Sequence, residues 1–203
     1  MVGIFTAGGT TGMGGPPFSA GQAAVGQPVS VALQVVDQNN TPVSGISVGW
    51  SVLPNGGRAD ALTTVSDTGG IVRVNWTLDT IAKLDSMRAS LASGVGGIVA
   101  ARGVHAAASV VVKIAGESQT VVVGSSAAPL VVRITDRFGN PAAGFTVAWD
   151  VISGDGTLSK ITTSTDENGM TQTSVTVGPT PGECRVLATF GTMPAVIFSL
   201  KAQ

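Results

Sequence analysis

The sequence contains one histidine, His105, and one cysteine, Cys184, the residue types most often used as general base and thiol nucleophile. His105 lies between the two halves of the chain, and no side chain that would orient its ring can be named. Cys184 stands next to Arg185, and a neighbouring cation can lower the pKa of a thiol, but free cysteines are more often buried core residues. We therefore expect no catalytic residue and no enzyme. One histidine and one cysteine also cannot form the usual zinc sites.

Four aspartates stand at related positions, namely Asp37, Asp67, Asp136 and Asp166. Calcium prefers oxygen ligands, so one interpretation of these residues is a calcium site. The other is that each aspartate begins a turn, where its side chain accepts hydrogen bonds from its own backbone amides. We favour the turns, because no cluster supplies the roughly six oxygens that calcium requires. We expect no metal and no cofactor.

These aspartates belong to an internal repeat with a constant spacing of 99 residues. Residues 37–50 (DQNNTPVSGISVGW) match residues 136–149 (DRFGNPAAGFTVAW), and the spacing continues without a gap to Gly70 and Gly169. Such a match is not expected by chance, so we interpret the chain as two copies of one unit. The repeated turn residues are Asp37, Pro42, Gly45, Asp67 and Gly70 in the first copy and Asp136, Pro141, Gly144, Asp166 and Gly169 in the second.

Short segments of each copy alternate apolar and polar residues, which is the pattern of half-buried β-strands. This alternation places Trp50, Trp149 and Trp76 on apolar faces. We interpret these tryptophans as core residues rather than as platforms for sugar binding. Later strands are predicted at 87–91 and 98–104 in the first copy and at 186–190 and 196–200 in the second. The sequence therefore predicts an all-β protein of two tandem immunoglobulin-like β-sandwich domains, 1–107 and 108–203.

The paired motif Asp-x-x-x-x-Pro-x-x-Gly-x-x-Val-x-Trp, followed by Thr/Ser-Asp-x-x-Gly, resembles the bacterial Ig-like group 1 family. Repeats of that family build the rods of intimin- and invasin-type surface proteins. The resemblance covers residues 20–203, and the second copy is the closer match. The first copy departs at residues 39–41, and Lys83 stands where the second copy has Gly182. The resemblance implies a role as spacer, stalk or adhesive repeat, and it implies no catalytic residues.

The composition argues against several other classes of function. The net charge is −1 and charged residues make up 11%, against about 25% in average domains, so we expect no binding to nucleic acid or to an acidic membrane. No apolar run approaches the roughly 20 residues of a membrane-spanning helix. Tyrosine is absent, which disfavours carbohydrate binding. We expect protein partners or self-assembly.

The N-terminal arm leaves two arrangements open. Residues 2–6 have strand character and precede a glycine-rich stretch at 8–15. They form either the first strand of the first copy, equivalent to residues 110–114, or a strand added to the sheet edge of a neighbouring molecule.

The leading functional hypothesis is a non-catalytic structural or adhesive module of a bacterial surface protein, located outside the cell. The alternative is a structural component of a phage virion, such as a decoration, fibre or tail protein. A polysaccharide-binding accessory domain is a third hypothesis. Because the first residues lack the basic start and apolar core of a signal peptide, a native start at Met1 would favour the virion.

Overall fold

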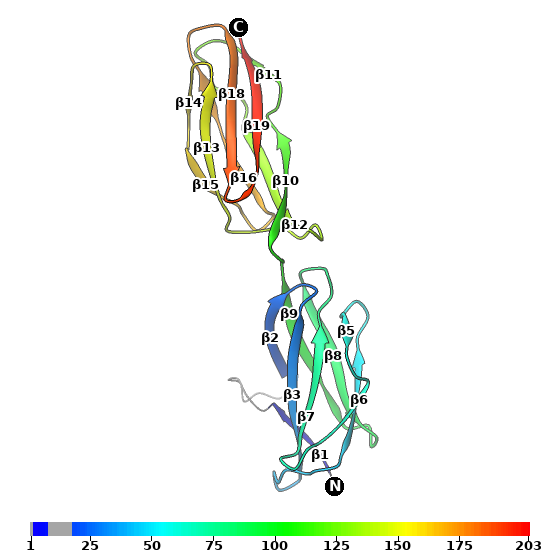
Figure 1. The fold of residues 1–203 in the computed structure, drawn as a ribbon. Helices are drawn as coiled ribbons and strands as arrows, with labels where there is room; N and C mark the ends of the chain where they lie inside the picture. The colour runs from blue at the N-terminus through cyan, green and yellow to red at the C-terminus, as the bar shows by residue number, and fades with distance from the viewer. Residues whose placement is uncertain (1, 8–17) are drawn as a thin grey trace. The chain divides into compact units, whose positions relative to one another are not determined.

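The computed structural model describes residues 2–7 and 18–203, with side chains from Phe18 onward. These residues form nineteen β-strands. Figure 1 shows the fold as a ribbon. The chain divides into two compact units, Met1–Val104 (unit 1) and His105–Gln203 (unit 2). The predicted boundary lies three residues later, between 107 and 108. No helix in the described part of the chain is long and apolar enough to cross a membrane. The predicted all-β fold class is confirmed.

Unit 1 consists of two facing sheets. A four-stranded sheet has the order β1-β3-β7-β5, and a five-stranded sheet has the order β2-β9-β8-β4-β6. The strands are β1 (Val2–Ala7), β2 (Phe18–Ala24), β3 (Pro28–Asp37), β4 (Ser47–Val52), β5 (Arg58–Ala59), β6 (Thr63–Val65), β7 (Ile71–Thr77), β8 (Leu84–Leu91) and β9 (Gly96–Val104).

Unit 2 repeats this arrangement with its own sheets, β10-β12-β16 and β11-β19-β18-β13-β15, and with the separate pair β14-β17. The strands are β10 (Ala108–Ala115), β11 (Gln119–Val121), β12 (Leu130–Asp136), β13 (Thr146–Ser153), β14 (Gly156–Leu158), β15 (Thr162–Ser164), β16 (Met170–Thr173), β17 (Val175–Val177), β18 (Gly182–Phe190) and β19 (Met193–Ala202).

The core of each unit is built from the inward positions of alternating strands. In β7, for example, Val72, Val74 and Trp76 are buried, whereas Arg73 and Asn75 between them are exposed. The equivalent positions of unit 2 are also buried, although Thr171 and Thr173 replace valines there. A cluster of fifteen buried residues fills unit 1, and one of seventeen fills unit 2.

The N-terminal strand belongs to its own unit. β1 pairs antiparallel with β3, with Ile4 opposite Val36 and Phe5 opposite Val35. In unit 2, β10 pairs with β12 in the same way. The first of the two predicted arrangements is therefore the one observed, and the glycine-rich stretch at 8–15 lies outside the described residues.

The later strands begin earlier than the sequence pattern predicted. β8 starts at Leu84 and β18 at Gly182, rather than at residues 87 and 186. The extension of β8 adds Asp85 at an inward position, where the expected residue is apolar. A charged group therefore enters the interior of unit 1 at the start of this strand.

Candidate functional site

The four predicted turn aspartates share one geometry. In each, Oδ1 accepts hydrogen bonds from the backbone amides two and four residues later, at 2.8–2.9 Å. One oxygen of each carboxylate is thus occupied by its own turn. No group of three or more histidine, cysteine, aspartate or glutamate side chains able to hold a metal occurs among residues 2–7 and 18–203. The four turn aspartates with this geometry are Asp37, Asp67, Asp136 and Asp166.

The glycines of these turns serve a backbone role. Gly70 and Gly169 have φ angles of 74° and 71°, which favour glycine. A Cβ atom at Gly169 would stand 2.3 Å from the carbonyl oxygen of Ile134, so a side chain there would displace the neighbouring strand. Gly45 and Gly144 have φ angles of 75° and 78° but open space around them. The chain next to each is held by an isolated bridge from Pro42 or Pro141.

The three tryptophans lie in the cores, each with its indole N–H satisfied. Trp50 and Trp149 are 3% exposed, and their Nε1 atoms donate to Thr64 Oγ1 and Thr163 Oγ1 at 2.8 Å. Trp76 is fully buried and donates to the carbonyl oxygen of Gly56 at 2.6 Å. None of the three presents a ring face to solvent for a sugar to stack on.

Asp136 has a second role at the start of unit 2. Its Oδ2 accepts hydrogen bonds from the amide of Ala106 at 2.8 Å and from Asn140 Nδ2 at 2.9 Å. Burial alone would raise the pKa of Asp136, but the hydrogen bonds from Asn140, Ala106 and Phe138 outweigh it and lower that pKa. The segment entering unit 2 is therefore held by a carboxylate.

His105 lies in this same entering segment. Its ring is tilted against Phe145 at a centroid distance of 5.9 Å, and Nδ1 lies 2.8 Å from the carbonyl oxygen of Ala106. The ring packs on unit 2, and no carboxylate orients it there. This placement agrees with a linker residue rather than a general base.

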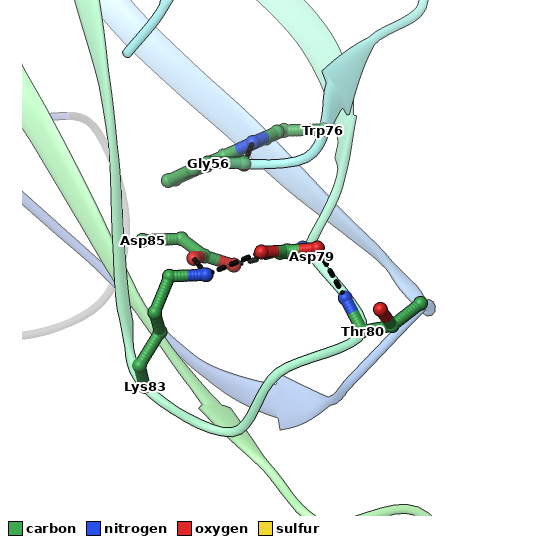
Figure 2. Close-up of polar contacts among 6 residues, drawn as sticks. All are labelled: Gly56, Trp76, Asp79, Thr80, Lys83 and Asp85. Atoms are coloured by element: carbon green, nitrogen blue, oxygen red, sulfur yellow. Dashed lines mark hydrogen bonds and ion pairs between the residues drawn. The ribbon is translucent and has the colours of Figure 1, made fainter. Parts of the chain in front are cut away.

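One polar cluster was not predicted from the sequence. Asp79, Lys83 and Asp85 meet between the end of β7 and the start of β8, as Figure 2 shows. The ammonium of Lys83 contacts the carboxylate of Asp79 and lies 3.1 Å from Asp85 Oδ1. Asp85 Oδ2 accepts the backbone amide of Asp79 at 2.9 Å, and the Asp85 side chain is completely buried. These ion pairs and the hydrogen bond therefore hold the two ends of the loop between β7 and β8 together.

The contacts in this cluster favour the charged forms of Lys83 and Asp79. Burial alone would lower the pKa of Lys83, but the adjacent carboxylates of Asp79 and Asp85 outweigh it and raise that pKa. The hydrogen bond from Lys83 lowers the pKa of Asp79. A lysine kept protonated in this way is not a nucleophile. The arrangement is suited to holding a loop in place rather than to catalysis.

Unit 2 has uncharged residues at the same three positions, namely Gly178, Gly182 and Cys184. Cys184 is 1% exposed, and both burial and the charge of Asp155 raise the pKa of its thiol. The thiol is therefore less acidic than a free cysteine, although Arg185 follows it in the sequence. The geometry supports the interpretation of Cys184 as a core residue.

A groove of about 490 Å³ in unit 2 lies along β15 and β16. Threonine, serine and glutamine side chains line most of it, with Lys160 and Asp166 as its charged residues. These two side chains form no ion pair with each other in unit 2, every residue of which is described. The groove thus brings no reactive pair together.

Acidification is expected to destabilise the protein below about pH 4. The pKa values of Asp37, Asp67, Asp79 and Asp136 are lowered, so their stabilising effect is present above the unfolded-state pKa of about 3.9 and is lost as pH falls through the folded-state values. Denaturant unfolding at pH 7, 4 and 3 measures this loss. The variant Asp136→Asn should lose less stability on acidification than the unaltered chain. Stability that increased toward pH 3 would contradict the assignment.

Removing divalent cations is expected to leave the melting temperatures unchanged, since the turn carboxylates already accept their own backbone amides. Thermal unfolding with EDTA and with added calcium measures this. A saturable rise in melting temperature with calcium that disappears in Asp166→Asn would instead identify that turn as a cation site.

Comparisons with known proteins find one family match and similar folds. Residues 108–196 match the model of the bacterial Ig-like domain (group 1). The solved structure of FdeC, an Escherichia coli adhesin, is 21% identical, covers 88% of this chain and 59% of that chain, and superposes with a TM-score of 0.66. Yersinia pseudotuberculosis InvD is 16% identical over 93% of this chain and 56% of its own, with a TM-score of 0.55. The chain thus spans little more than half of either solved chain, and both are similar to it in fold.

Proposed function

We propose that the chain is a non-catalytic structural or adhesive module of a bacterial surface protein, because residues 108–196 match the model of the bacterial Ig-like domain (group 1). The observation that carries the proposal is that the repeated turn aspartates and core tryptophans use their polar groups inside the fold. The turn aspartates bind their own amides, and the tryptophan indoles donate to neighbouring residues. Two copies of such a unit are suited to act as a spacer between other parts of a surface protein and to bear mechanical load.

We also propose that unit 1 is a second copy of the same domain type, so that the chain consists of domains 1–107 and 108–203. The same contacts recur in both units at a spacing of 99 residues. Trp50 N donates to Leu62 O and Trp149 N to Ile161 O, both at 2.8 Å. FdeC, which is similar in fold, is an adhesin, and this supports an extracellular location and protein partners for this chain.

Surface labelling tests the location. Antibodies raised against the chain are expected to label intact cells of the source bacterium, and brief protease treatment of those cells should remove the signal. A cytoplasmic protein of the same cells serves as the control that the cells stay intact. Recovery of the chain in purified phage particles, with unlabelled cells, would contradict the proposal and support the virion alternative.

Single-molecule force spectroscopy tests whether the two units bear load as separately folded domains. A load-bearing pair of sandwiches should unfold in two separate events, each releasing on the order of 300 Å of chain. The destabilised variant Trp149→Ala should weaken one event and leave the other unchanged. A single event releasing the whole chain would show that the two units do not fold separately.

A further inference from the structure

The sheet edges of unit 2 are unequal. β11 and β15 are three residues long, which limits the pairing that they can offer to another strand. The edge of β16 is partly occupied, because Met170 bonds to the Asp166 turn and Ser159 bonds to Ser174. β10, by contrast, is an edge strand of eight residues.

The backbone of β10 has one unpaired side. β10 pairs with β12 alone, with Val110 opposite Thr135 and Val112 opposite Arg133. Ile134 of β12 bonds away from β10, since its amide donates to Gly169 and its carbonyl oxygen accepts from Ala142. In an antiparallel ladder the bonding direction alternates, so Val111 and Lys113 direct their backbone groups to the free edge. No strand of unit 2, which is described in full, pairs with that edge.

The outer face of this strand is apolar. Val110, Val112 and Ile114 are 43%, 43% and 50% exposed. Edge strands are commonly protected by an exposed lysine. The lysine of this strand, Lys113, is solvent-exposed but lies on the opposite face, with Nζ 5.3 Å from the centroid of the Phe198 ring and its ammonium paired with Glu117. The outer strip therefore contains β-branched aliphatic residues without a charge.

We propose that β10 pairs antiparallel with β10 of a second copy of this chain, joining two β16-β12-β10 sheets into one continuous sheet. In the register that the free backbone groups favour, Val112 lies opposite its own copy and Val110 opposite Ile114. The residues Val111 and Lys113 of each chain then exchange about four backbone hydrogen bonds.

A second copy fits this edge because the strip is complementary to itself under two-fold symmetry. Each cross-strand pair on the outer face joins two β-branched aliphatic side chains, so the pairing buries apolar surface of one copy against apolar surface of the other. The charge of Lys113 meets Val111 of the other copy, and its own Glu117 neutralises it. An acidic or strongly polar partner strand would find no complementary group on the strip.

Disulfide trapping tests the register in the full chain with Cys184→Ala, which leaves no other thiol. Val112→Cys should form an intermolecular disulfide under mild oxidation, because directly opposite residues bring their Cβ atoms within about 5.5 Å. Val110→Cys should not cross-link to itself but should cross-link to Ile114→Cys when the two variants are mixed. Ile161→Cys, 70% exposed elsewhere on unit 2, is the matched control. Cross-linking of Ile161→Cys as fast as Val112→Cys, or none at Val112, would overturn the proposal.

Sedimentation equilibrium tests the association without a cross-link. The unaltered chain should dimerise reversibly, and Val112→Lys should weaken the dimer at least tenfold, whereas Ile161→Lys should leave it unchanged. Thermal unfolding of both variants verifies that unit 2 stays folded. A chain that remains monomeric up to about 1 mM, or a dimer that Val112→Lys does not weaken, would exclude this pairing.

Discussion

Replacing Trp149 with alanine is expected to lower the free energy of unfolding of unit 2 by about 3–5 kcal/mol, and Trp50→Ala should do the same to unit 1. Each side chain is 3% exposed within its core cluster, so the substitution removes a large buried surface and leaves a cavity. Denaturant unfolding followed by fluorescence measures the loss, because each variant retains tryptophan in the chain. Unfolding should show two transitions. Each substitution should lower the denaturant midpoint of one transition and leave the midpoint of the other unchanged.

Two variants separate the burial of Trp149 from its hydrogen bond. Trp149→Phe retains most of the apolar surface but loses the donor to Thr163, and Thr163→Val removes only the acceptor. Each should therefore cost less than the alanine variant, with a contribution from the hydrogen bond of about 1 kcal/mol. A loss below about 1 kcal/mol for both alanine variants would mean that these residues do not hold the cores together.

The turns and the core residues could be predicted because the same motif occurs twice in the sequence, at a spacing of 99 residues. Asp67-Thr-Gly-Gly and Asp166-Glu-Asn-Gly differ in their middle residues yet keep the aspartate and the last glycine, which the geometry requires for amide acceptance and for a positive φ. Trp50 and Trp149 likewise lie at the same step of an alternating strand. Where the two copies agree, local chemistry and tertiary packing point to the same structure.

The Lys83 cluster was missed because the two copies disagree there. Asp85 corresponds to Cys184, and a charged residue at the start of a strand normally marks the end of the buried pattern. The available signal was the period of two in β8, which continues from Met87 back to Asp85. The burial of Asp85 depends on Lys83 reaching back over the loop, and sequence spacing alone does not show that contact.

The exposed strip of β10 could not be read from the sequence for a related reason. Residues 110–112 are three consecutive valines, and such a run does not reveal which side chains face the core. The structure resolves the alternation, since Val111 packs against the core cluster while Val110 and Val112 face outward. Which of these valines is exposed therefore depends on how the strand packs in its sheet rather than on the local sequence.

Replacing Asp85 with alanine is expected to destabilise unit 1 by about 2–4 kcal/mol and to leave unit 2 unaffected. The substitution leaves the amide of Asp79 without its acceptor and deprives Lys83 of the buried carboxylate at 3.1 Å. The estimate lies toward the lower part of the range for broken buried pairs, because the Lys83 side chain is 33% exposed and keeps its contact with Asp79. Denaturant unfolding at pH 7 measures the loss, and Cys184→Ala at the equivalent position of unit 2 is the matched control without a charge.

A double-mutant cycle identifies the source of this effect. Lys83→Met leaves Asp85 buried without its counter-ion, and Asp85→Leu leaves Lys83 with Asp79 alone. If the charge pair holds the loop, the combined variant should cost less than the sum of the two single variants, by roughly 0.5–3 kcal/mol. Replacing both partners with apolar residues of similar size avoids an unpaired buried charge, so the combined variant should remain folded. Strict additivity would show that Asp85 acts only by accepting the amide of Asp79, and that Lys83 lies beside it without stabilising the loop.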